Sequence, residues 1–157
     1  MKFTLIKDIK KDKTMSLILK GFLVFIFLYL ISDILVMNSN FGLSVESISS
    51  TLFGNEEEYL DPINEAAFLE FWHIQIFFIM MILFTLSAIF IRLANRSRLI
   101  VTNILMISAI SSLLAIVLAY YMASFFVSVY IFTFFIWHIT AIYMIFYSFW
   151  KLNAQSI

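Results

Sequence analysis

The stretch FWHIQIFFIMMILFTLSAIFI, at residues 71–91, decides the fold of this chain. It contains no charged residue, and it is bounded by Glu70 on one side and Arg92 on the other. An α-helix of about 20 apolar residues, rising roughly 1.5 Å per residue, covers the ~30 Å hydrocarbon core of a bilayer. The stretch is therefore predicted to be a membrane-spanning helix.

Composition places the whole chain among membrane proteins. Of its 157 residues 63% are hydrophobic and only 13% are charged, whereas soluble domains carry about 25% charged residues. The polar stretches are too short to fold as a separate soluble domain, so we expect one transmembrane domain over residues 1–157. The chain has no cysteine, which excludes disulfides, thiolate chemistry and cysteine-bound iron–sulfur clusters. It carries neither a glycine-rich nucleotide motif nor a serine-hydrolase elbow, so an enzyme is not the leading prediction.

Further apolar stretches predict the rest of a helical bundle. After a basic tail at 1–16, residues 17–37 are predicted to form the first span. Residues 99–150 carry no formally charged side chain and are more than twice as long as one span. This predicts two spans, 99–121 and 126–150, joined by a short turn. The predicted fold is all-α, with four transmembrane helices.

The charged side chains are divided between the two sides of these spans. All ten lysines and arginines lie in residues 1–20, in the turn 92–98 and at position 151, whereas the loop 38–70 carries seven acidic residues and no basic one. Under the positive-inside rule both termini are cytoplasmic and the loop lies outside. No small-residue cleavage site follows the first apolar stretch, so we expect an uncleaved anchor. The predicted location is the inner (cytoplasmic) membrane of a bacterium.

The outer loop contains two helix-start signals. Ser44 is placed to cap a short helix and Gly54 to end it, which predicts a helix lying on the membrane surface. The apolar residues of this segment recur at helical spacing: Val45, Ile48, Leu52 and Phe53. Asp61 followed by Pro62 predicts an N-cap and a first helical position, from which a helix would continue into the second span.

Acidic side chains make this loop the predicted contact surface of the protein. Four of them lie close together in the sequence, at Glu56, Glu57, Glu58 and Asp61. Charge complementarity would attract a basic soluble protein, a subunit of a membrane complex or divalent cations. The simpler interpretation is a hydrated loop that is kept outside by its lack of lysine.

Small residues predict a close helix contact in the third span. Ser111, Ala115, Ala119 and Ala123 lie four residues apart, and such a ridge lets two backbones approach closely. The ridge serves either packing inside the bundle or a homo-oligomer. Apart from protein partners we expect contact with the lipid bilayer and none with nucleic acid.

A few ionisable groups lie at membrane depth: Asp33, His73 and His138, with Glu70 near the outer surface. Such groups are costly inside a bilayer and mark functional sites. We expect the first three side chains to point into one polar pocket in the outer half of the bundle. His138 is the favoured partner of Asp33, because the two lie at similar depth. The simpler interpretation is that each histidine is neutral and hydrogen-bonded to a hydroxyl or carbonyl of a neighbouring helix.

Three functional hypotheses use these groups. A b-type haem held between His73 and His138 would make the protein a small membrane cytochrome, although the two histidines differ in depth. A mononuclear metal site for zinc, copper or non-haem iron would draw on Asp33, Glu70, His73 and His138. A proton or ion relay would use Asp33 and His138, because histidine changes its charge near neutral pH.

The leading prediction from the sequence is nevertheless a non-catalytic accessory or structural membrane component with an acidic outer contact loop. Its basis is the absence of any catalytic motif together with the exposed acidic loop.

Overall fold

The computed structural model of this protein describes residues 13–94 and 98–154. The predicted basic tail up to residue 12 and the centre of the basic turn, 95–97, lie outside this part. The described elements are α1 (Lys13–Asn40), α2 (Val45–Phe53), the 3₁₀ helix η1 (Glu56–Glu58), α3 (Glu65–Leu93), α4 (Arg98–Tyr121) and α5 (Phe125–Asn153). Four of these helices are long and apolar enough to cross a membrane. The predicted all-α fold with four spans and a short outer helix is confirmed.

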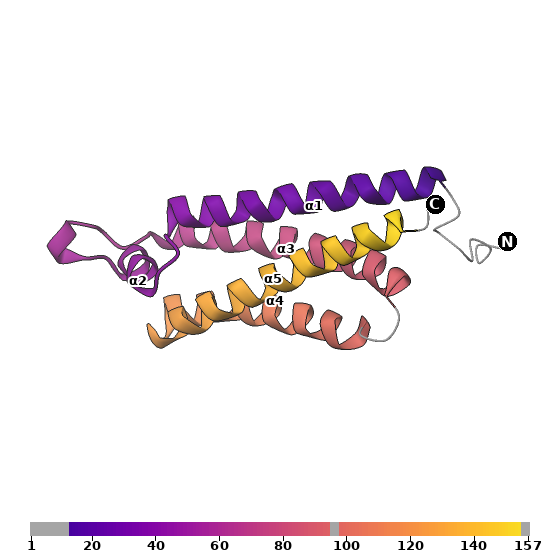
Figure 1. The fold of residues 1–157 in the computed structure, drawn as a ribbon. Coiled ribbons are helices and arrows are strands. Elements are labelled where there is room, and N and C mark those ends of the chain that lie inside the picture. Colours follow the sequence, from indigo (N-terminus) through magenta and orange to yellow (C-terminus); the bar gives the residue numbers. More distant parts are fainter. Residues whose placement is uncertain (1–12, 95–97, 155–157) are drawn as a thin grey trace.

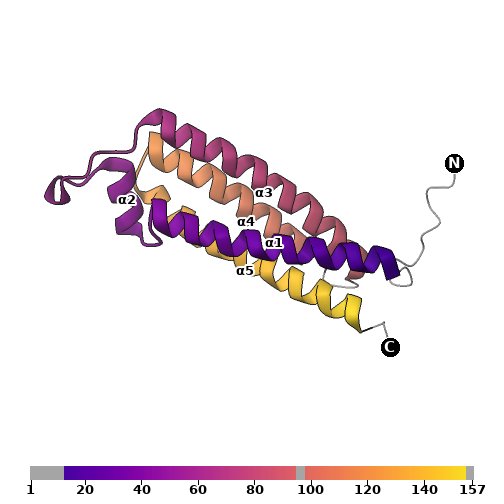
Figure 2. The ribbon, with the colours of Figure 1, turned by 90° about the horizontal axis from the view of Figure 1, so that it is seen from above.

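The four long helices form one elongated bundle. The first residues of α1 and the last of α5 lie at one end, and α2 with the loop around it extends from the opposite end (Figure 1). Seen from above, α3 runs beside α4, and α1 runs beside α5 (Figure 2). The most extensive contact is between α4 and α5, while α1 touches α3 and α5 less extensively. In the most apolar 18-residue window of α1 only 17% of the residues are buried. Most of this helix is therefore available for contact with lipid.

Two apolar clusters hold the bundle together. The inner cluster lies toward the end with the termini and includes Leu23, Leu86 and Phe90. The outer cluster joins the long helices to α2, and its members include Ile48, Leu52, Phe68, Ile116 and Val127. Since Ile48 and Leu52 are buried, α2 is seated on the outer end of the bundle by its apolar face.

The ends of α2 are the predicted ones. The Ser44 hydroxyl accepts a hydrogen bond from the Ser47 amide at 3.1 Å, as an N-cap does. Gly54 ends the helix at φ 82°, and a Cβ there would lie 2.9 Å from the Leu60 carbonyl oxygen. A residue with a side chain would therefore be strained at this position in both backbone and packing.

The start of α3 differs from the prediction. The helix begins at Glu65, and its N-cap is Asn64, whose side-chain oxygen accepts from the Ala67 amide at 2.9 Å. Asp61 and Pro62 precede it in a non-helical segment. Asn64 is itself a preferred N-cap residue, and it is the one whose side chain makes the capping bond. The segment before it is tied to α2, because the Ile63 amide donates to the Thr51 carbonyl at 2.9 Å.

Asn64→Ala should therefore cost about 1 kcal/mol of helix stability, because an orphan amide of the first turn loses its acceptor. Amide hydrogen exchange over residues 65–68 should become faster. The matched control is Asp61→Ala, which removes an exposed side chain outside the helix and should leave this exchange unchanged. The reverse order of effects would place the helix start at Asp61.

The small-residue ridge of α4 contributes to packing within the bundle. Ala115 and Ala119 are buried, and they belong to the same cluster as Val127 and Tyr130 of α5. This agrees with the closest helix pair of the bundle being α4 and α5. Ala123 is exposed in the turn between them.

Candidate functional site

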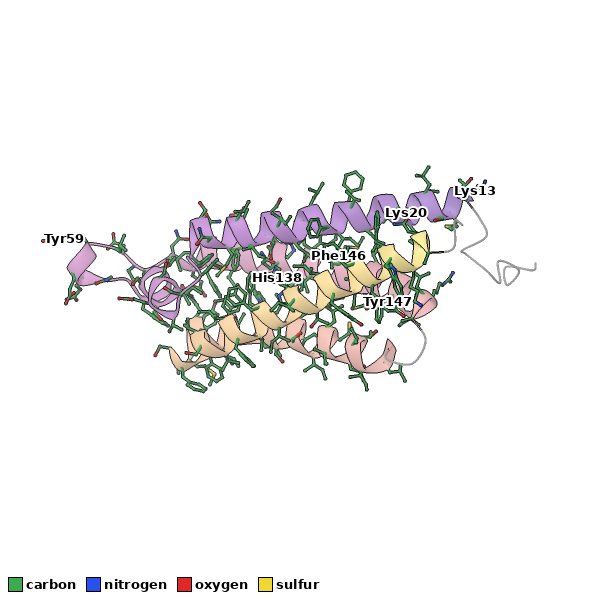
Figure 3. The ribbon with its side chains drawn as sticks, viewed as in Figure 1. Lys13, Lys20, Tyr59, His138, Phe146 and Tyr147 are labelled. Carbon is green, nitrogen blue, oxygen red and sulfur yellow. The ribbon has the colours of Figure 1, made fainter. Side chains whose placement is uncertain are left out.

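A carboxylate and an imidazole meet inside the bundle. Asp33 of α1 and His138 of α5 are 5% and 1% exposed, and Oδ2 of the former lies 3.2 Å from Nε2 of the latter. His138 lies among the side chains that fill the space between the helices (Figure 3). Neither atom has an aligned hydrogen-bond partner among the described residues. The two are therefore held at ion-pair distance and face each other.

The second oxygen of Asp33 is held by two other side chains. The Gln75 amide of α3 donates to Oδ1 at 2.8 Å, and the Tyr29 hydroxyl, one turn earlier on α1, lies at 3.5 Å. The carboxylate thus has polar partners on three helices. This is the compensation that a buried carboxylate requires, because an unpaired one would cost several kcal/mol or become protonated.

The orientation of the His138 ring is fixed by its own helix. Its Nδ1 lies 2.9 Å from the Phe134 carbonyl oxygen, which can only accept, so Nδ1 carries a hydrogen. The ring also packs against Phe134 and Trp137, with ring centroids at 4.1 Å and 3.8 Å. The nitrogen whose protonation can change is therefore Nε2, the one that faces Asp33.

One proton shared between these two groups would leave the pair without net charge. With that proton the pair is either a carboxylic acid beside a neutral imidazole or a carboxylate beside an imidazolium, and both forms have no net charge. Without it, a carboxylate would face the lone pair of Nε2 at 3.2 Å in a bilayer interior. That form carries one net negative charge, which the Gln75 amide and the Tyr29 hydroxyl on Oδ1 partly offset.

The other two predicted site residues do not join the pair. His73 and Glu70 are exposed on α3. Positions 73 and 75 differ by about 200° around an α-helix, so when Gln75 faces Asp33, His73 faces outward. The predicted convergence therefore holds for Asp33 and His138 and is wrong for His73. Within residues 13–94 and 98–154, no group of three or more His, Asp or Glu side chains is placed to hold a metal ion.

Two members of the polar cluster were not predicted from the sequence, namely Gln75 and Tyr29. The sequence does contain a signal that could have identified Gln75 as a site residue, because it is the only glutamine within the four predicted spans. A carboxamide at membrane depth needs partners as an ionisable group does. No such signal marks Tyr29, because tyrosine is common in membrane helices.

The predicted contact surface lies at the end of the outer loop, in residues 55–61, which we call the tip. Two hydrogen bonds between Asn55 and Leu60, at 2.9 Å and 3.0 Å, close its base. Tyr59 has a positive φ of 54° and is 96% exposed, pointing away from the bundle (Figure 3). The neighbouring acidic residues Glu56, Glu57 and Asp61 are exposed, and the side chain of Glu58 lies outside the described part.

These features define the chain as a polytopic membrane protein: a four-helix transmembrane bundle with a buried polar pair. A family model described as a transmembrane helical domain, Aq_1264_TM, matches residues 42–156. The chain belongs to this family. No curated protein and no solved structure matches it. The matched segment includes Gln75 and His138, whereas Asp33 lies in α1, which precedes it.

Proposed function

We propose that this protein is a small non-catalytic component of a bacterial inner membrane that takes up and releases a proton at the Asp33–His138 pair. The observation that supports it is the 3.2 Å contact between two buried ionisable groups, Asp33 and His138. Imidazole changes its charge near neutral pH, and a facing carboxylate offers a second site for the same proton. A proton relay needs such a pair as its elementary step.

The geometry favours this proposal over haem or metal binding. Nδ1 of His138 is used by the Phe134 carbonyl, and Nε2 faces Asp33, so an iron or zinc ion would have to displace one of them. His73, the other predicted axial ligand, is exposed on α3. Catalytic zinc usually has three protein ligands, whereas Asp33 and His138 supply two.

Magnetic resonance of ¹⁵N-labelled histidine in bilayers tests the proposal. The chain has two histidines, so His73→Gln leaves only the signal of His138. Its Nε2 resonance should change reversibly with pH if the pair takes up and releases a proton. In Asp33→Asn the imidazole should stay neutral throughout, because a buried imidazolium has then lost its counter-charge. A resonance that is constant with pH in the parent protein contradicts the proposal.

A second function is favoured by the outer tip: an accessory role in which the tip contacts a basic partner, either a soluble protein or a subunit of a membrane complex. An exposed tyrosine held at a positive φ is unusual, and here it lies among exposed acidic side chains. Aromatic residues contribute strongly at protein interfaces, and the surrounding negative charge would guide a basic partner to them. This role and proton exchange are compatible in one protein.

The accessory role as proposed places the tip on the outer side of the inner membrane, and introduced cysteines test this. Because the chain has no cysteine, Glu57→Cys and Arg92→Cys each carry a single thiol. In intact cells the thiol at position 57 should react with a membrane-impermeant reagent, and the one at position 92 should react only after the membrane is opened. The opposite pattern would invert the proposed orientation.

A further inference from the structure

An apolar groove lies between the inner halves of α1 and α5. Its volume is about 150 Å³, and all of its lining side chains are apolar: Leu23, Val24 and Phe27 of α1 with Ile145, Phe146 and Phe149 of α5. Val24 and Phe146 are 47% and 60% exposed, so the groove is open on the outside of the bundle, where lipid lies. Apolar cavities of about this size stay dry and take up apolar molecules.

The groove is closed toward the outer side and continues toward the inner membrane surface. The rings of Phe27 and Phe146 meet edge to face, with centroids 5.7 Å apart and an interplanar angle of 68°. Because α1 runs outward and α5 runs inward, this ring pair lies at the outer end of the groove, and Leu23 and Phe149 lie at its inner end. An acyl chain in the groove would therefore come from a lipid of the inner leaflet.

Two lysines extend the α1 side of the groove toward the membrane surface. Lys20 precedes Val24 by four residues and Phe27 by seven, which places it within about 40° of both around the helix. Lys13 precedes Lys20 by another seven residues and lies on nearly the same face. Lys20 is half-buried and Lys13 is exposed, and both lie toward the end with the termini (Figure 3). Long side chains of this kind bring their ammonium groups to the level of the lipid headgroups.

The protein supplies little negative charge to these two ammonium groups. Residues 13–32 of α1 and the whole of α5 contain no acidic residue, and the tail before α1 has four lysines against two aspartates. Lipid phosphates are the anions at this level of the membrane. Basic pockets between membrane helices on the cytoplasmic side bind anionic headgroups, and the cytoplasmic leaflet carries negative charge.

A second groove, between α3 and α4, provides an internal comparison. It is also apolar and has a larger volume, about 230 Å³. Its nearest basic residue on α3, Arg92, lies eight residues from the lining residue Phe84, and Arg98 of α4 lies eight residues from Met106, which is roughly 12 Å of helix in each case. Lys20 is only four residues from the lining of the first groove. Of the two grooves, the one between α1 and α5 has the closer basic group.

From these observations we infer that the groove between α1 and α5 binds an anionic phospholipid of the inner leaflet. One acyl chain lies in the groove, Lys20 binds the phosphate, and Lys13 adds to the attraction. The inference is independent of the proposed proton exchange. The bound lipid fills the space that α1 leaves against α5 and so contributes to holding α1 in the bundle.

Photocrosslinking in phosphatidylcholine vesicles tests this site. The probe is phosphatidylglycerol with a diazirine on one acyl chain, and mass spectrometry locates the labelled residues. The probe should label the α1–α5 groove about fivefold more than the α3–α4 groove, the effect of one basic side chain near the membrane surface. A phosphatidylcholine probe with the same chains should label both grooves about equally. Equal labelling by the anionic probe, or the same preference with both headgroups, overturns the inference.

Lysine variants test the assignment of the phosphate to Lys20. Lys20→Gln should remove most of the preference of the anionic probe, and Lys20→Arg, which keeps the charge, should retain it. The matched control is Lys151→Gln, because Lys151 lies about 200° around α5 from Phe149, and its Nζ lies over the Trp150 ring at 4.9 Å from the centroid. This control should keep the preference. Equal losses in Lys20→Gln and Lys151→Gln, or no loss in Lys20→Gln, overturn the role of Lys20.

A second copy of this chain is the competing occupant of the groove. Because the chain has no cysteine, Val24→Cys introduces a single thiol on the exposed edge of the groove. Under oxidation in the vesicles this variant should remain monomeric on a denaturing gel. Efficient formation of a disulfide-linked dimer would show that protein covers the groove and would overturn the lipid site.

Discussion

Replacing His138 by leucine should destabilise the protein by about 3–5 kcal/mol, because Asp33 then remains buried without the group that faces its Oδ2 atom. Reversible unfolding in mixed micelles measures this loss. The double variant Asp33→Leu/His138→Leu should recover most of it, because replacing both members of a buried pair by apolar residues is often neutral or stabilising. Strong coupling between the two positions is the expected result of their direct contact inside the bundle.

The control for this cycle is His73→Leu, which changes an exposed histidine of α3 and should alter stability by no more than about 0.5 kcal/mol. If His138→Leu were as mild as this control, the contact with Asp33 would contribute nothing measurable to stability, contrary to this prediction.

Phe68→Ala should produce the second large effect, a loss of about 3–5 kcal/mol, since it removes a fully buried aromatic ring. The ring is 0% exposed and stacks on Tyr120 of α4 with centroids 4.1 Å apart and an interplanar angle of 7°. It belongs to the outer cluster that also holds α2. Amide exchange in α2 should therefore become faster together with the loss of global stability.

Phe77→Ala is the matched control on the same helix, because Phe77 is 53% exposed and faces away from the outer cluster. It should cost far less, since little packing is lost. Equal costs for the two variants would mean that lipid contacts, rather than the outer cluster, stabilise this end of α3.

The spans and the caps of α2 could be predicted because their determinants are local. The length of an apolar run and the residues Ser44 and Gly54 act over one or two turns of chain. The start of α3 was predicted three residues too early, because Asp61 and Asn64 are both preferred N-cap residues and the N-cap rule does not choose between them.

The same distinction separates the two histidines. Depth along a span can be counted from the sequence, and it correctly paired Asp33 with His138. The sequence does not indicate which face of α3 points into the bundle, because a membrane helix is apolar on its lipid face as well as inside the bundle. His73 was therefore placed inside, and Gln75, which does face inward, was missed.

The distance in sequence between Asp33 and its partners has a consequence for biosynthesis. About one hundred residues separate it from His138, and at ~5–20 residues per second a ribosome needs roughly 5–20 s to add them. During that interval α1 has emerged while the imidazole that will face its carboxylate has not yet been made. The nascent chain must therefore shield or protonate an acidic side chain near the bilayer until α5 arrives. Completion of the last helix is thus the event that supplies the last polar partner of Asp33.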